Sequence, residues 1–110
     1  MKIRVTYEGK EYNLGFTKRT ITQMESQGFD ISQIDSRMVT MIPMFYRGAF
    51  DAYHPTASKT TRDEVWKAQR NKQGLLMALA EAYNGVVMSL MSEPEATEGD
   101  EGNETWAVVE

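Results

Sequence analysis

The chain has 110 residues, of which 41% are hydrophobic and 25% are charged. These values are ordinary for one globular domain and too apolar for a wholly disordered chain. There is no cysteine and one histidine, His54, which excludes a disulfide framework and argues against a zinc site or a Ser-His-Asp triad. The sequence also lacks a glycine-rich phosphate-binding motif and an apolar run typical of a signal peptide or a membrane span. We therefore expect a non-enzymatic cytoplasmic protein with no cofactor, metal or membrane partner.

The charge is divided unevenly along the chain, whose net charge is -4. Residues 93–110 contain seven acidic residues and no basic one, whereas residues 1–92 contain nine acidic and twelve basic residues. The last segment is rich in Glu, Gly and Thr and cannot bury enough apolar surface to fold. The sequence thus predicts one folded domain, 1–92, and a disordered acidic tail, 93–110, with a short apolar end.

The first sixteen residues alternate apolar and polar side chains, which predicts a β-hairpin over residues 2–16. A turn at Gly9-Lys10 puts glycine at the first central position, as a type II′ turn requires. The facing residues are then Tyr7 and Tyr12, Val5 and Leu14, and Ile3 and Phe16, all on one side. A turn at Glu8-Gly9 would set Tyr7 against Lys10 and leave Phe16 unpaired, so we reject it.

Four helices are predicted after the hairpin, over about 18–27, 41–54, 62–70 and 72–92. Thr17 is the expected N-cap of the first helix, which ends at Gly28. Thr40 is the expected cap of the second, with Pro43 in its first turn. Thr61 and Glu64 have the spacing of a capping box for the third. In the connector 28–40, Ser32 could cap a single helical turn. The fold class is therefore α+β, a hairpin packed on about four α-helices.

The last predicted helix is apolar over more than a third of its circumference, more than one core contact needs. Methionine recurs along the chain, and its flexible side chain suits surfaces that accept several partner shapes, although a single methionine more often fills a gap in a core. We expect a homo-oligomer and a surface for protein partners. The candidate partner-binding residues are Met41, Met44, Met77, Met88, Met91, Trp106 and Val108.

Other polar residues have simpler interpretations than catalysis or nucleic-acid binding. His54 is expected at a helix C-terminus, where the dipole favours it. Asp63 can pair with Lys67 one turn later. Basic residues around Trp66 could touch nucleic acid, but a solvated helix face accounts for them better.

The apolar residues 105–109 at the end of the acidic tail have two candidate uses. They could add a strand to an edge of the hairpin, in the same subunit or a neighbouring one. They could instead serve as a tethered bait for a β-rich partner protein.

Eight short segments, taken in order and followed by the acidic tail, carry a resemblance to a known family: Tyr7-Glu-Gly-Lys-Glu-Tyr12, Leu14-Gly-Phe16-Thr-Lys-Arg19, Met24-Glu25, Gly28-Phe29-Asp30-Ile31, Met41-Ile42-Pro43, Gly48-Ala49-Phe50, Tyr53-His54-Pro55 and Tyr83-Asn84. They resemble a family of small structural-module proteins of phages and prophages, and the resemblance covers residues 3–94. These proteins are in turn similar to the tail assembly chaperones of long-tailed phages.

The resemblance implies a folded N-terminal domain that oligomerises and coats the helical tape measure protein in the host cytoplasm. It also implies an acidic extension that recruits tail tube protein, and absence from the finished virion. Two alternatives stay open. One is a permanent virion component, such as a tail or head–tail connector protein, and the other is a small phage nucleic-acid-binding regulator.

Overall fold

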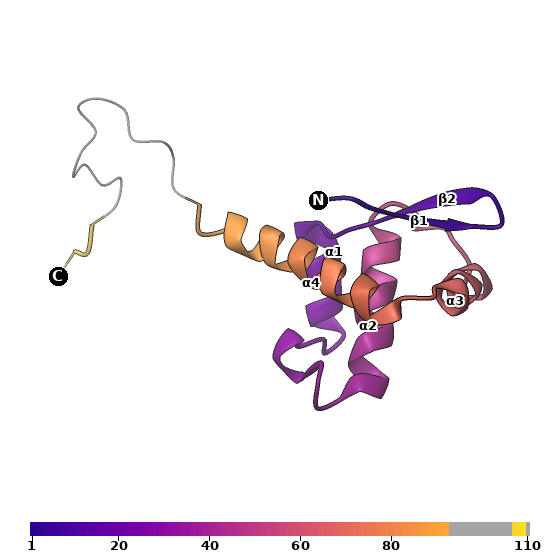
Figure 1. The fold of residues 1–110 in the computed structure, drawn as a ribbon. Helices are drawn as coiled ribbons and strands as arrows, with labels where there is room; N and C mark the ends of the chain where they lie inside the picture. Colours follow the sequence, from indigo (N-terminus) through magenta and orange to yellow (C-terminus); the bar gives the residue numbers. More distant parts are fainter. Residues whose placement is uncertain (93–106, 110) are drawn as a thin grey trace, which may run out of the picture.

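The computed structural model describes residues 1–92 and 107–109, and it shows a β-hairpin followed by helices (Figure 1). The elements in chain order are β1 (Ile3–Tyr7), β2 (Lys10–Leu14), α1 (Lys18–Ser26), the 3₁₀ helix η1 (Ile31–Gln33), α2 (Met38–Asp51), α3 (Lys59–Ala68) and α4 (Lys72–Ser89). The α+β class with four α-helices is confirmed. The predicted disordered tail, 93–110, lies outside the described residues except for 107–109.

The hairpin turn lies at Glu8-Gly9, so the predicted turn at Gly9-Lys10 is wrong. Both turn residues have positive φ, 50° at Glu8 and 75° at Gly9, as a type I′ turn requires. This turn matches the right-handed twist of the two strands, which explains why it is adopted although Glu8 must take a left-handed conformation. The resulting pairs are Ile3 with Leu14, Val5 with Tyr12, and Tyr7 with Lys10. Phe16 has no strand partner and is buried beyond the end of β2.

The start and the end of α1 are confirmed. Thr17 accepts a hydrogen bond from the backbone N–H of Thr20 at 3.1 Å, and the Thr20 hydroxyl oxygen accepts one from the N–H of Thr17 at 3.0 Å. This reciprocal pair is a capping box with threonine in place of the usual Glu or Gln. Gly28 follows the helix with φ of +96°, the left-handed conformation that ends helices at glycine. Ile21 and Met24 are buried, as predicted.

The single turn η1 is capped by Asp30 and not by Ser32. The Asp30 carboxylate accepts hydrogen bonds from the backbone N–H and the hydroxyl of Ser32, at 3.0 and 2.7 Å. These bonds hold the pKa of Asp30 below its ordinary value, because they favour the charged form.

Helix α2 starts at Met38, three residues before the predicted start, and ends at Asp51 rather than at residue 54. Thr40 is therefore not its cap. The N-cap residue is Arg37, whose side chain makes no capping bond but whose carbonyl accepts from the N–H groups of Thr40 and Met41.

The early start places Pro43 inside α2 instead of in its first turn. Because proline has no N–H, the carbonyl of Val39 lacks its helical partner. Val39 is 91% exposed, so water can satisfy that carbonyl. The proline is tolerated because it lies on the solvent side of the helix start.

Helix α3 starts at Lys59 and is capped by Ser58, so the predicted capping box of Thr61 and Glu64 is wrong. The Ser58 hydroxyl accepts from the N–H of Thr61 at 3.1 Å. Glu64 instead accepts a hydrogen bond from the hydroxyl of Tyr7.

Helix α4 begins where the sequence predicts, after a break at Asn71. The Asn71 side chain caps it by accepting from the N–H of Gly74 at 2.9 Å. The helix ends at Ser89, three residues before the predicted end.

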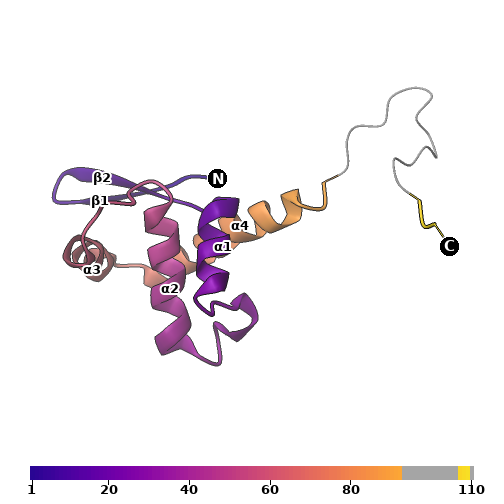
Figure 2. The same cartoon turned by 180° about the vertical axis from the view of Figure 1, so that it is seen from behind.

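Helix α2 lies at the centre of the fold. It contacts α1, β2, η1 and α4, whereas α3 packs against β1. Figure 2 shows α1 and α2 side by side with α4 crossing behind them. Phe45 of α2 is fully buried and lies among the rings of Phe16, Phe29 and Tyr83, at centroid distances of 5.0–5.7 Å. None of the helices within residues 1–92 combines the length and the apolar composition of a membrane-spanning segment.

Candidate protein-binding surface

Helix α4 carries two apolar stripes at helical spacing. The inner stripe faces the core and consists of Leu75, Leu79, Ala82, Tyr83 and Val86. The outer stripe consists of Leu76, Met77, Ala80, Val87, Met88 and Met91. At 100° per residue the two stripes lie about a third of a turn apart. One face of the helix is therefore used in folding, and a second apolar face is left over.

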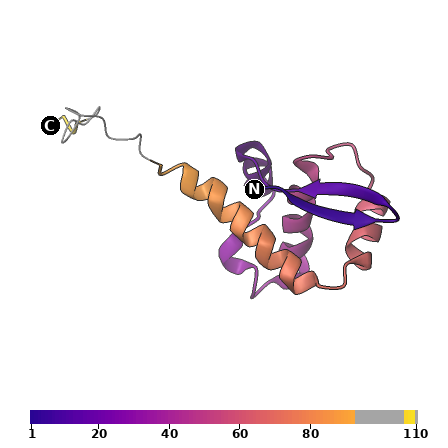
Figure 3. The ribbon, with the colours of Figure 1, turned by 45° about the horizontal axis from the view of Figure 1, so that its top comes forward.

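Four of the six residues of the outer stripe are exposed, and the other two, Leu76 and Ala80, are half-buried against the core. Met77 and Met88 are each 67% exposed, and Met91 is 77% exposed. Figure 3 shows why, because the end of α4 projects beyond the body of the fold. Leu90, which continues the inner stripe past Val86, is also exposed for this reason. Single apolar residues are common on surfaces, but a contiguous patch of this kind marks an interaction site.

The first half of the outer stripe forms one wall of an apolar groove of about 570 Å³. The other wall comes from η1 and the start of α2. The apolar lining residues are Ile31, Ile34, Met38, Ile42, Phe45, Leu76, Met77 and Ala80. The stripe thus begins in a groove and ends on a projecting helix.

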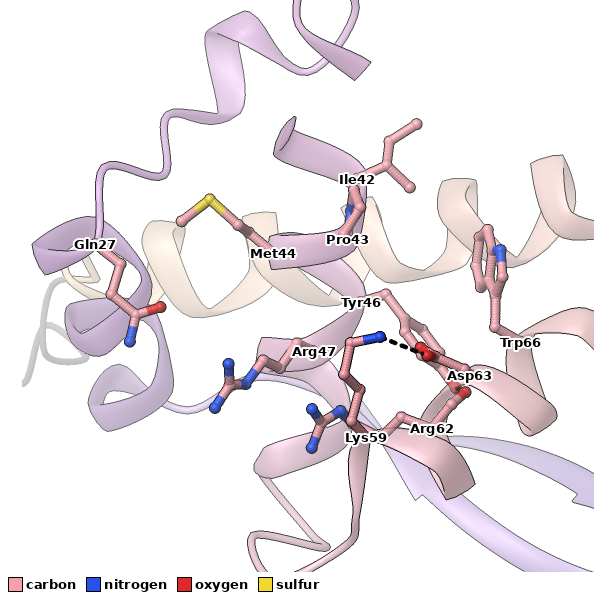
Figure 4. Close-up of a pocket in the computed structure, with 10 residues that line it drawn as sticks. All are labelled: Gln27, Ile42, Pro43, Met44, Tyr46, Arg47, Lys59, Arg62, Asp63 and Trp66. Carbon is pink, nitrogen blue, oxygen red and sulfur yellow. Dashed lines mark hydrogen bonds and ion pairs between the residues drawn. The ribbon is translucent and has the colours of Figure 1, made fainter. Parts of the chain in front are cut away.

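A second hollow, of about 340 Å³, lies between α2 and α3 (Figure 4). Its floor is apolar, with Ile42, Pro43, Met44 and Trp66. Its rim carries Arg47, Lys59, Arg62 and Asp63. Lys59 contacts Asp63 at 2.8 Å, and Arg47 and Arg62 contact the same carboxylate, Asp51, at 3.5 and 4.0 Å. Most of the rim charge is thus paired, and one positive charge is left over beside the apolar floor.

The two adjacent carboxylates of α3 have separate structural partners. Asp63 pairs with Lys59, one turn earlier. The predicted pair of Asp63 with Lys67 is wrong. The hydrogen bond from Lys59 holds the pKa of Asp63 below its ordinary value. Because Glu64 turns to Tyr7, the pair does not form an acid–base site.

His54 lies three residues beyond the end of α2 and donates its backbone N–H to the carbonyl of Phe50 in the last turn of that helix, at 2.9 Å, but its side chain has another partner. Its Nε2 accepts a hydrogen bond from the backbone N–H of Asn13 at 3.0 Å. Its ring packs on Tyr12 and Phe50, with centroids 5.4 and 5.3 Å away. His54 therefore connects the outer edge of β2 to the core. Because the N–H of Asn13 is already bonded, it is not available to pair with a strand added at this edge.

The predicted partner-binding residues occupy three environments. Met41 is 1% exposed and belongs to the core, so it is not part of this surface; Met44 is half-buried on the wall of the α2–α3 hollow. Met77, Met88 and Met91 lie together on the outer stripe. Val108 is exposed, and Trp106 lies outside the described residues.

Sequence reasoning missed the groove, and it left Leu76 and Val87, which widen the apolar surface of the last helix, out of the candidate partner-binding residues. The available signal was the position of these two residues next to Met77 and Met88. The pairs 76–77 and 87–88 are about three helical turns apart and therefore lie on one side of the helix, away from the inner stripe. Met38 and Ile34 could not be assigned to the groove, since they come from other elements. Among residues 1–92 and 107–109, no three His, Asp or Glu side chains are placed to hold a metal ion.

Comparison with known proteins gives one match. Searches of curated proteins and of solved structures found none. The model of a family described as a domain of unknown function, DUF5055, matches residues 1–109. That match spans nearly the whole chain, hairpin, groove and outer stripe included, and the protein therefore belongs to the DUF5055 family.

Proposed function

We propose that this protein is a tail assembly chaperone of a long-tailed phage. In this role it self-associates and holds the tape measure protein, the tail tube protein or both in the host cytoplasm until the tail is built. The proposal combines the resemblance of residues 3–94 to phage structural-module proteins with one structural observation, the exposed outer stripe of α4. A protein whose longest helix displays a second apolar face has surface to spare for protein partners.

The chemistry of that surface suits helical clients. An amphipathic helix places apolar anchors about every three or four residues, and a groove between helices can receive them. Methionine side chains adapt to anchors of different shape. The paired charges around the α2–α3 hollow, and the acidic residues after position 92, would keep such an assembly soluble.

Co-expression with the tape measure protein of the same phage tests the proposal. We expect the client to become soluble and to co-purify with the chaperone, and Met88→Lys to reduce capture. Ser89→Lys is the matched control, because it adds the same charge one residue away, at an exposed position outside the outer stripe.

Purified virions separate the proposal from its main rival. A chaperone should be absent from finished particles, and deletion of its gene should stop tail formation. Finding the protein in stoichiometric amounts in virions would instead identify a permanent tail or connector component. Steeply salt-dependent binding to DNA, without client capture, would identify a nucleic-acid-binding regulator.

A further inference from the structure

We infer that the outer stripe of α4 is the interface of a symmetric antiparallel dimer, in which the α4 helix of a second copy covers it. This inference gives the self-association of the proposed chaperone a definite geometry and in that sense rests on the proposed function. In the protein alone, the occupant of the groove is then the projecting end of α4 from the other copy, and a client helix would take its place.

The helical period places both ends of the stripe on one side of α4, with Asn84 between them. Leu76 and Met77 line the groove, and Val87 and Met88 follow three turns later on the same side, since eleven residues span about three turns. The groove and the projecting apolar end are therefore two parts of one straight surface. One part is concave and the other is convex.

An antiparallel pair brings these two parts together twice. When two α4 helices run in opposite directions, the projecting end of each lies in the groove of the other, as a two-fold interface requires. Residues whose numbers add to 164 then face each other, so that Met77 meets Val87 and Leu76 meets Met88. Ala80 and Asn84 meet at the centre, where the small side chain of Ala80 permits a close approach of the helices.

Charge favours the antiparallel direction over the parallel one. The basic residues near the start of α4 are Lys67, Arg70 and Lys72, and the acidic residues that follow its end include Glu93 and Glu95. In an antiparallel pair, the basic start of α4 in one copy lies next to the C-terminal end of α4 in the other copy. The acidic residues follow that end in the sequence. A parallel pair would place Lys72 beside Lys72 and repel.

The available area is sufficient for a weak dimer. If a fully exposed methionine offers about 200 Å², the exposed parts of the stripe together with Met38 amount to roughly 600 Å² per copy. Two copies then bury about 1,200 Å², the lower end of the range for specific interfaces. We therefore expect a dimer at micromolar concentration.

Cysteine crosslinking tests the geometry directly, because the chain has no cysteine of its own. Met77→Cys and Val87→Cys are made separately, each at an exposed helical position, and one of the two proteins carries a size tag. In the antiparallel dimer, position 77 faces position 87 of the partner, whereas two copies of position 77 lie about 15 Å apart along the helices. A disulfide needs Cα atoms within about 7 Å.

The expected result is a disulfide-linked heterodimer when the two variants are mixed under mild oxidation, with little crosslinking of either variant alone. Efficient self-crosslinking of each variant would show a parallel pair and overturn the inference. Monomeric sedimentation of the unmodified chain at 100 μM, with no crosslinking in the mixture, would overturn it as well.

Charge substitution provides the second arm. Met88→Lys should raise the dimer dissociation constant by about tenfold or more, since it places a charge in an apolar contact, while the circular dichroism spectrum stays unchanged. Ser89→Lys should leave the dimer intact. Equal effects of the two variants would overturn the inference. These measurements use the protein alone, so a confirmed dimer that captures no tail protein would refute the proposed function and leave the interface standing.

Discussion

Tyr7 at the end of β1 donates a hydrogen bond to the carboxylate of Glu64 in α3, at 3.0 Å and across 57 residues of sequence. This bond, with a smaller contribution from lost hydration, raises the pKa of Tyr7 from 10.0 to about 12. The folded state thus holds the phenol proton more tightly than the unfolded state.

The first prediction concerns the pH dependence of this bond. The stabilisation by Tyr7 is fully present below pH 10 and is lost as the pH rises through about 12, because only the protonated phenol can donate. Tyr7→Phe should therefore be less stable than the unmodified protein at pH 8, and the difference should shrink between pH 10 and 12. Urea denaturation at each pH measures this. A difference that stays constant to pH 12 would contradict the prediction.

The second prediction uses two glycines in helices as a matched pair. A Cβ at Gly48 of α2 would collide with the side chain of Met24, whereas one at Gly85 of α4 would meet nothing within 4 Å. Gly48→Ala should cost about 1–3 kcal/mol of the free energy of unfolding through overpacking. Gly85→Ala should stabilise the protein by about 0.5–1 kcal/mol through helix propensity.

A double-mutant cycle checks the cause of the Gly48 effect. In the background of Met24→Ala, the Gly48→Ala change should cost less than in the unmodified protein, since the colliding side chain is gone. Additive costs would mean that Gly48 is required for another reason.

The third prediction concerns His54. His54→Ala leaves the N–H of Asn13 without its acceptor and should cost about 1–3 kcal/mol. His54→Gln retains an acceptor group and should recover part of the loss. Thermal denaturation measures the stability, and amide hydrogen exchange at Asn13 should be faster in the alanine variant. Unchanged exchange at Asn13 would show that the bond does not protect this edge.

The fourth prediction concerns the start of α3. Ser58→Ala should lower stability by about 1 kcal/mol, because the hydroxyl caps the helix. Thr60→Ala, an exposed change within the same helix, is the control and should have little effect. If Thr60→Ala costs as much as Ser58→Ala, the cap is not the cause.

The hairpin shows how a prediction can be right about burial and wrong about pairing. The predicted and observed registers differ by two residues, and side chains alternate with a period of two. Val5, Tyr12 and Leu14 therefore face the core in both. The turn itself could not be chosen from the sequence, because the conformation of Glu8 depends on the twist of the finished strands.

Helix ends were predictable where a local side chain decides them and not elsewhere. Thr17 and Gly28 act within their own turns, and both assignments are confirmed. The start of α2 depends on the backbone of Arg37 and not on its side chain. A search for capping side chains therefore cannot find it. Glu64 looked like a capping residue by spacing, but its partner is Tyr7, which no local pattern can reveal.

The candidate surface was predictable in part. The excess of apolar residues on the last helix indicated exposure, and Met77, Met88 and Met91 are exposed as a group. Met41 could not be separated from them, because burial of a methionine depends on which face of α2 meets the core. The periodicity that predicts a helix does not say how much of it the rest of the fold covers.

The contact between Trp66 of α3 and Tyr46 of α2 provides a built-in optical probe. Their ring centroids are 5.0 Å apart, and the Tyr46 hydroxyl also donates to the carbonyl of Arg62 at 2.9 Å. Tyr46 can pass excitation energy to Trp66 while α3 packs against α2, and this transfer becomes weaker as the two rings separate. The wavelength and intensity of tryptophan emission, recorded in a Trp106→Phe background that leaves one emitter, will thus report the seating of α3 in real time. A client side chain entering the hollow beside Trp66 would change the same signal without any added dye.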